Sequence, residues 1–297
     1  MLDITCQKQF VNQRGYRIMI DLKRNSKKIP VPASGLRVRK KFIYKPNQLE
    51  DFKISRGKFW DFLTCPKCFY LDRVAGLDVP KTPQWTLNET TDLLLKKEFD
   101  YLRVLQKPHR LFIENKLDHL VPFQHEEMDA WRDALHRGLK IRYKDTNIIL
   151  TGGVDDIWQD KITKKLIIVE YKSQAKNGLI TTKEYLEDPY HKGYKVQIDF
   201  YSYLLTSMGF DVHPTSYFLV CNAIRTTNNF NKVMKFDEYL IPYDWNNDWV
   251  EEEIDNMIKT MNYDKIPEAN PCCRNCAYSE QYAKLKSTKS VQNGDSY

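Results

Sequence analysis

The sequence predicts a mixed α/β fold, in which a short mixed central sheet is flanked by helices, and three patterns carry this prediction. The segment 152–172, GGVDDIWQDKITKKLIIVEYK, contains two apolar runs around the polar loop DKITKK, as in a β-hairpin. Apolar residues repeat at helical spacing in segments 88–106 and 248–262. A further helical pattern, YKVQIDFYSYLL, follows the hairpin at 194–205. Strand patterns that alternate with helical ones indicate this class of fold.

The elements before the hairpin are predicted from caps, breakers and apolar spacing. Residues 55–77 predict a helix that begins at Ser55 and is interrupted or kinked at Pro66, because proline lacks a backbone N–H. Segment 88–106 then predicts a second helix, and segment 123–139 predicts a third, amphipathic one. Three helices are therefore expected before the sheet.

Strands are predicted on both sides of the hairpin. Segment 144–153, KDTNIILTGG, leads as a strand directly into the hairpin, so that a three-stranded meander is expected. Segments 215–224 and 235–243 predict two further strands. A short strand is also compatible with FVNQRGYRIMI at 10–20.

The chain of 297 residues divides into three parts by composition. Residues 1–50 are predicted to form a basic N-terminal extension, 51–280 the main domain and 281–297 a polar tail. The net charge of +7 favours an anionic partner, and the basic residues that crowd the N-terminal part are either a nucleic-acid-contacting arm or a solvated surface. No run approaches 18 apolar residues and the N-terminus lacks the apolar core of a signal peptide, so we expect a cytoplasmic protein with no membrane partner.

The register of the hairpin places two carboxylates opposite each other. If the hairpin is symmetric about the middle of its loop, opposed residue numbers sum to 325 and Asp155 faces Glu170. Opposed residues share a face of the sheet with β-carbons about 4.5–5.5 Å apart. Lys172 projects from the same face, two residues beyond Glu170. Asp156 falls on the opposite face, although a slip of one residue would exchange the two aspartates.

Two acids and one lysine at the end of a buried strand suit metal-assisted chemistry. Hard divalent cations such as Mg²⁺ prefer oxygen ligands, often one or two carboxylates together with water and substrate phosphate. Such an ion lowers the pKa of a bound water and neutralises charge on a phosphodiester. A neighbouring lysine can orient that water. The alternative is an ordinary salt bridge on the surface of a hairpin.

A second pair of residues extends this pattern. Gln197 and Tyr201 lie at i and i+4 of the predicted helix and so share one helix face. The order of motifs resembles the RecB-like branch of the PD-(D/E)XK nuclease superfamily over residues 52–280. The matching motifs are the opening helical stretch at 55–77, GGVD at 152–155, EYK at 170–172 and QIDFY at 197–201.

The resemblance implies a restriction-endonuclease-like core and a metal-dependent nuclease that hydrolyses DNA phosphodiester bonds, exonuclease-like, in DNA repair, recombination, or phage or CRISPR DNA processing. It implies Mg²⁺ or Mn²⁺ held by Asp155 and Glu170, and water positioned or activated by Lys172. Gln197 and Tyr201 would steady the lysine and the DNA strand. The implied partners are DNA, with RNA not excluded, and a helicase or another DNA-processing protein. The alternative is a catalytically silent DNA-binding or scaffolding module of the same fold.

In this superfamily an upstream helix often supplies a histidine or a carboxylate to the metal. The predicted helix at 88–106 contains no histidine, but it carries Glu98 and Asp100. Asp100 lies where the resemblance would place the ligand and is the candidate for a third metal ligand. A solvated helix face explains both acids equally well.

The seven cysteines argue against a disulfide framework, because their number is odd and a cytoplasmic location is expected. CPKC at 65–68 and CCRNC at 272–276 supply two chelating turns. Four thiolates can hold tetrahedral zinc or an iron–sulfur cluster. The resemblance to CRISPR-associated and helicase-linked exonucleases implies a [4Fe–4S] cluster, and zinc or no metal remain as alternatives. The predicted ligands are Cys65, Cys68, Cys273 and Cys276, with Cys272 as the substitute.

Overall fold

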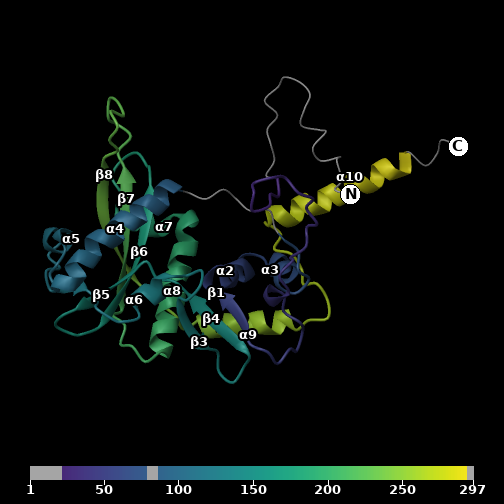
Figure 1. Ribbon diagram of the computed structural model, residues 1–297, viewed down its shortest axis with the longest axis horizontal. Coiled ribbons are helices and arrows are strands. Elements are labelled where there is room, and N and C mark those ends of the chain that lie inside the picture. Colours follow the sequence, from purple (N-terminus) through teal and green to yellow (C-terminus); the bar gives the residue numbers. More distant parts are fainter. Residues whose placement is uncertain (1–21, 79–85, 293–297) are drawn as a thin grey trace.

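The computed structural model describes residues 22–78 and 86–292 and confirms the mixed α/β fold. The strands form two mixed sheets flanked by helices (Figure 1). Within the larger, five-stranded sheet neighbouring strands pair antiparallel, except that the third and fourth strands run parallel. In spatial order its strands are β2 (Leu120–Pro122), β5 (Asp156–Asp160), β6 (Leu166–Gln174), β7 (Thr215–Ala223) and β8 (Phe236–Asp244).

The smaller sheet corrects the predicted meander. It has the order β1 (Phe52–Ser55), β4 (Ile148–Gly152) and β3 (Leu139–Arg142). Strand β4 was expected to pair with the hairpin, but β1 and β3 occupy its two edges, so β4 has no free edge for β5. The partner strand β1 lies almost a hundred residues upstream, which local sequence patterns do not reveal.

The helices surround both sheets (Figure 1). The long helix expected at 123–139 is wrong: a short α6 (Met128–Arg132) ends where Asp133 accepts a hydrogen bond from the His136 backbone N–H, and β3 follows. The other helices are α2 (Arg56–Thr64), α3 (Pro66–Arg73), α4 (Thr86–Leu105), α5 (Arg110–Glu114), α7 (Thr182–Glu187), α8 (Lys192–Ser207), α9 (Val250–Met261) and α10 (Arg274–Gln292), with short 3-10 turns at Lys40–Phe42 and Pro189–His191.

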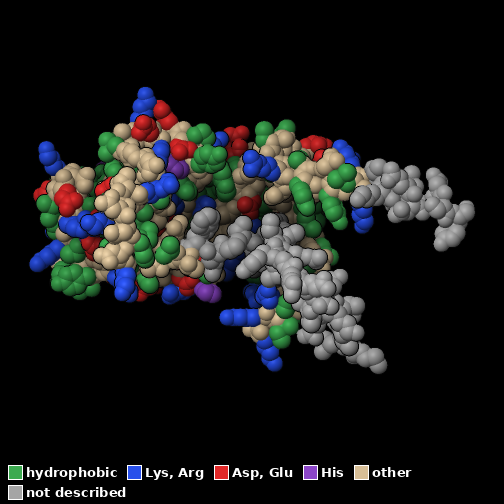
Figure 2. Space-filling model, turned by 90° about the horizontal axis from the view of Figure 1, so that it is seen from above, with side chains coloured by type: hydrophobic (Ala, Val, Ile, Leu, Met, Phe, Trp, Pro, Cys, Tyr) green, Lys and Arg blue, Asp and Glu red, His purple; other side chains and the backbone are tan. Residues whose placement is uncertain are grey.

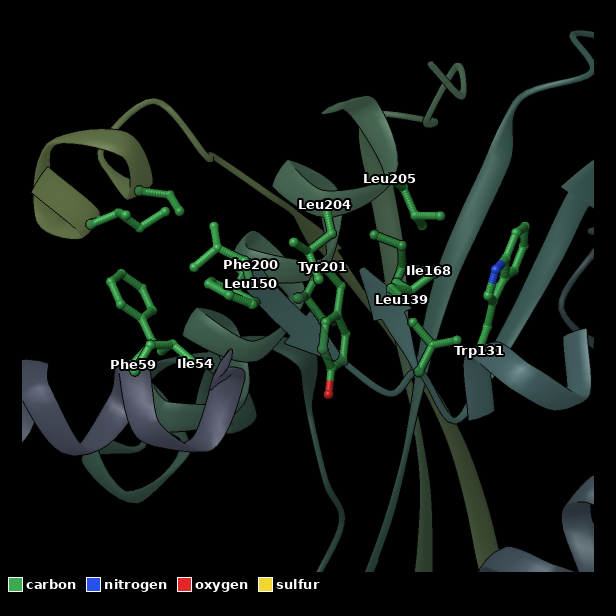
Figure 3. Packing of buried hydrophobic residues seen from close by; sticks show 14 of the residues in the cluster. Ile54, Phe59, Trp131, Leu139, Leu150, Ile168, Phe200, Tyr201, Leu204 and Leu205 are labelled. Carbon is green, nitrogen blue, oxygen red and sulfur yellow. The ribbon is translucent and has the colours of Figure 1, made fainter. Parts of the chain in front are cut away.

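Strand β6 is buried on both faces, and its alternation assigns each side chain to one of two hydrophobic clusters. Ile167 and Val169 pack with α4 and α5, next to Phe99. Ile168 lies on the other side, in the cluster that also contains Leu205 of α8 (Figure 3). Burying each such side chain contributes about 1.5–3 kcal/mol. The even-numbered side chains at the charged end of β6 therefore project toward α8.

Helix α8 lies between the two sheets and contacts β6 on one side and β3 and β4 on the other. A glycine permits this close approach, because a β-carbon on Gly152 would lie 2.6 Å from the ring of Tyr201. Figure 3 shows the Tyr201 ring among the apolar side chains of this cluster, with its hydroxyl pointing out of it. Gly152 thus allows α8 to pass close to the end of β4.

The regions predicted as terminal segments contact the core over part of their length. Tyr44 is buried, and its hydroxyl donates to the side-chain oxygen of Asn262 at 3.1 Å. Arg37 forms an ion pair with Asp72 of α3. The strand considered at 10–20 lies outside the described residues. In the predicted polar tail, α10 continues as a helix to Gln292.

Candidate active site

The hairpin has the predicted register. Ile157 pairs with Ile168 and Asp156 with Val169, so that opposed residue numbers sum to 325. Asp155 immediately precedes β5, and its Oδ2 accepts a hydrogen bond of 2.9 Å from the backbone N–H of Tyr171. This bond fixes the Asp155 carboxylate beside Glu170 at the open end of the hairpin.

Side chains from β6 and α8 converge on the Glu170 carboxylate. Lys172 Nζ donates to Glu170 Oε1 at 2.6 Å, and the amide of Gln197 donates to the same oxygen. Gln197 Nε2 also donates to the Tyr201 hydroxyl oxygen at 3.1 Å. The Lys172 ammonium lies 4.4 Å from the centre of the Tyr194 ring, a favourable cation–π distance. The structure therefore brings the side chains of the five predicted residues into one cluster.

The cluster carries more negative charge than its own cation balances. Burial and the neighbouring Glu170 raise the pKa of Asp155 to about 7. Glu170 is 3% exposed, and its Oε2 is buried without a hydrogen-bond partner in the described part of the chain. A buried, unpaired carboxylate oxygen is costly. A divalent cation bound there would supply the missing partner, so these donors fit the metal that the sequence predicts.

The N-terminal half of α4 completes a pocket at this end of the sheet. Asp92 and Lys96 of α4 form an ion pair at 2.9 Å, and the Lys96 ammonium also lies 3.9 Å from Asp155 Oδ1. Burial and the nearby Asp155 raise the pKa of Asp92. The pocket has a volume of about 310 Å³ and is lined by Asn88, Glu89, Asp92, Asp155, Tyr171, Lys172, Ser173 and Tyr194.

Asp100, the predicted third ligand, does not line this pocket, and this corrects the prediction. It follows Asp92 by eight residues, which places it about 12 Å further along the helix axis. There it pairs with Arg103 at 3.1 Å and with Arg132 at 2.7 Å. Asp100 therefore belongs to a structural ion-pair network and is not positioned to join Asp155 and Glu170.

Asp92 is an acidic pocket residue that the sequence interpretation missed, although a signal for it exists. Leu95 and Phe99 are buried and mark the inward face of α4. Asp92 precedes them by three and seven residues and so lies on that same face, whereas Asp100 does not. The apolar spacing of α4 would have selected Asp92.

Asp156 lies on the opposite face of the hairpin, as predicted. Both Arg103 and Arg132 donate to its Oδ1, and the Tyr171 hydroxyl donates to Oδ2 at 2.8 Å. Complete burial alone would raise the pKa of Asp156, but the two guanidinium groups outweigh burial and hold it below its usual value. With its oxygens occupied in this way, Asp156 anchors α4 and α6 to the sheet.

The predicted cysteine ligands also meet. The sulfur atoms of Cys65, Cys68, Cys273 and Cys276 all lie within 4.8 Å of one another. Cys272, the predicted substitute, is exposed and lies outside this group. The four sulfurs can hold a metal ion or cluster.

Paired carboxylates and a lysine at the end of a short mixed sheet are the arrangement expected of a metal-dependent nuclease. The sequence model of the PD-(D/E)XK nuclease superfamily matches residues 82–281, so the chain belongs to this superfamily. No curated protein sequence gives a significant match. In the described part of the chain, none of the helices combines the length and apolar character needed to cross a membrane.

Proposed function

We propose that the protein is a metal-dependent deoxyribonuclease whose active site is the cluster around Glu170. The observation that carries this proposal is the buried, unpartnered Glu170 Oε2 beside Asp155, with the Lys172 ammonium on the other oxygen. Mg²⁺ or Mn²⁺ would be held by Asp155, Glu170 and Asp92. Bound there, the ion would activate water and neutralise charge on the scissile phosphate.

Lys172 orients the attacking water and offsets phosphate charge. Its ammonium is held in place by the bond to Glu170 and by the Tyr194 ring. Gln197 supports both partners, because its amide nitrogen donates to Glu170 while its oxygen lies 3.5 Å from Lys172 Nζ. Tyr201 in turn holds the Gln197 amide. Locked side chains of this kind keep catalytic groups oriented without reorganisation during the reaction.

DNA would reach the site along the extended β7–β8 hairpin. Lys172 pairs with Val220, and β7 continues past the end of β6 into a tip at 224–235 that projects beyond the sheet (Figure 1). The tip carries Arg225, Lys232 and Lys235, and its Phe230 is 67% exposed. Cations can bind DNA phosphates, and an exposed aromatic ring can stack on a base.

The surface charge is mixed on one face of the molecule. On the face seen in Figure 2, lysine and arginine side chains alternate with acidic ones instead of forming a continuous basic area. We therefore assign the DNA contacts to local groups such as the hairpin tip and the pocket. The order of the motifs supports a RecB-like, exonuclease-like enzyme of DNA repair, recombination, or phage or CRISPR DNA processing, which would work beside a helicase or a similar partner.

A catalytically silent DNA-binding module is the second candidate, and Lys96 favours it. The Lys96 ammonium lies between Asp92 and Asp155, where it already balances part of the carboxylate charge. In a silent module this lysine would take the place of the metal. Such a protein would still bind DNA through its hairpin tip.

Digestion of linear, circular and single-stranded DNA with Mn²⁺, with Mg²⁺ and with EDTA tests the proposal. We expect cleavage of at least one substrate with metal and none with EDTA. Asp155→Asn should abolish cleavage, whereas the exposed Asp129, changed to Asn, is the matched control. Cleavage that persists in EDTA, or in Asp155→Asn, would refute the proposed site. DNA binding without cleavage under every condition would support the silent module.

A further inference from the structure

The four-cysteine cluster joins distant parts of the chain. Cys65 stands between α2 and α3, and Cys68 lies in the first turn of α3. Cys273 and Cys276 come from the start of α10, more than 200 residues later. All four are free thiols. Two chelating turns therefore face each other, each supplying two sulfurs.

The distances between these sulfurs identify the kind of metal that fits. Cys68 Sγ lies 3.5 Å from both Cys273 Sγ and Cys276 Sγ, and Cys65 Sγ lies 3.8 Å from Cys276 Sγ. Zinc binds thiolates at about 2.3 Å, so a regular tetrahedron of four sulfurs around one zinc ion has edges of about 3.8 Å. The observed separations therefore match one central ion.

A [4Fe–4S] cluster does not fit this arrangement. Its four cysteine ligands bind the outer sides of four irons in a cube, so the iron and sulfide atoms of the cube keep the thiolates much farther apart than one ion does. Here the four sulfurs lie within 4.8 Å of one another, which leaves no room for a cube between them. The cluster implied by the resemblance is thus not supported by the geometry.

We propose that Cys65, Cys68, Cys273 and Cys276 bind one structural Zn²⁺ and no iron–sulfur cluster. With four protein thiolates the coordination is closed, which is typical of structural zinc and leaves no position for substrate or water. Cys272 takes no part, because its side chain is exposed and outside the group.

The backbone around the site holds both turns in position for such an ion. Pro66 begins α3 directly after the extended Cys65, so the chain kinks between the two sulfurs. On the other side, the Asn270 side chain accepts from the Cys272 N–H at 2.9 Å and donates to the Thr64 carbonyl at 2.9 Å. Asn270 thereby joins the two turns independently of the metal.

The ion would attach α10 to the rest of the fold. Helices α2 and α3 are anchored by Phe59, Phe62 and Phe69, which are buried. Along the described side chains of α10, only Cys276 is buried, and the salt bridge from Lys67 to Glu280 at 3.0 Å lies on the surface. A surface pair contributes about 0–1 kcal/mol. Zinc binding is therefore the main interaction that holds α10 against α3.

Metal analysis of the full-length protein, purified without oxygen from medium that contains both iron and zinc, tests this inference. We expect about one zinc per chain, less than a tenth of that amount of iron, and colourless protein. Replacing zinc with cobalt should give the visible absorption of tetrahedral thiolate-bound Co²⁺. Stoichiometric iron with a brown colour, or protein that binds neither zinc nor cobalt after reconstitution, would overturn the proposal.

Variants separate the ligands from the neighbouring cysteine. Cys273→Ser should lose most of the zinc and make α10 accessible to limited proteolysis, whereas Cys272→Ser should keep both. Equal zinc loss in the two variants would refute the assigned ligands. If Cys273→Ser fails to fold, the cysteines that zinc shields from a thiol-modifying reagent can be mapped in the wild-type protein. We expect the four ligands to react only as zinc is released and the exposed Cys272 to react at once. None of these measurements depends on nuclease activity.

Discussion

Replacing Lys172 with alanine tests the catalytic centre most directly. The Lys172 ammonium lies 2.6 Å from Glu170 Oε1, so a water or phosphate oxygen bound beside that carboxylate would lie within about 4 Å of the ammonium. A unit charge pair at that distance is worth about 4 kcal/mol at an effective dielectric constant of 20. Allowing for partial solvation, we expect kcat to fall by about 10²–10³, as when one electrostatic donor is removed from other active sites.

The fold should tolerate this change. Gln197 still donates to Glu170 in the variant, so the carboxylate keeps one hydrogen-bond donor. DNA affinity, measured without a catalytic metal, should change by less than about threefold, because the variant keeps the cations proposed to bind phosphates at the hairpin tip. Lys53→Ala, an exposed lysine of β1, is the matched control.

Single-turnover cleavage with Mn²⁺, together with a binding assay and thermal unfolding, separates the possible outcomes. A folded Lys172→Ala protein that cleaves within threefold of the wild type would refute the assignment of Lys172. A variant that loses DNA binding in parallel with cleavage would show that Lys172 binds the substrate instead of acting on the reaction.

Three further changes test the metal ligand, the hairpin tip and the buried charge of α8. Asp92→Asn should raise the Mn²⁺ concentration needed for half-maximal cleavage at least tenfold, whereas Asp100→Asn should leave it unchanged. A larger increase in Asp100→Asn than in Asp92→Asn would identify Asp100 as the ligand. Phe230→Ala and Lys232→Ala should each raise KM for DNA with little effect on kcat. The loss of Lys232 should also reduce the salt dependence of DNA binding by about one phosphate contact. An unchanged KM in both variants would exclude the hairpin tip as a DNA-binding element. Burial raises the pKa of Asp199 from 3.8 to about 6, so the folded state binds the proton more tightly than the unfolded state does. As the pH rises from about 4 to 6, the free energy of unfolding should therefore fall by up to about 3 kcal/mol. Urea unfolding across this pH range should show that loss in the wild type and not in Asp199→Asn; equal slopes would contradict it.

The sequence predicts the hairpin well, because the side-chain period of a strand and the length of a short loop are local properties. Asp155 and Glu170 could be paired from numbering alone, and the register in the structure agrees. The two CxxC turns were equally visible. Each of these features lies within a single hairpin or a single turn, so the local sequence determines its geometry.

Features that depend on distant partners were not predictable in this way. Strand β4 pairs with β1, and this contact takes the edge that a local meander would have used. The identity of the third acidic residue at the site depends on which turn of α4 lies next to the hairpin. Arg132, which pairs with both Asp100 and Asp156, helps to fix that position. The choice between zinc and an iron–sulfur cluster depends on sulfur separations, which a sequence does not specify.

Lys96 is the residue on which the choice between a nuclease and a silent module depends. The side chains of Lys96 and of the two acids near it are 21–32% exposed, so the lysine can turn into solvent on its flexible stem. Displacing it costs about one partly exposed ion pair, about 0–1 kcal/mol. A divalent ion in its place brings twice the charge and can also reach the buried Glu170 Oε2, which Lys96 leaves without a partner. The carboxylates therefore gain more from the metal than from the lysine, and the arrangement favours the active enzyme.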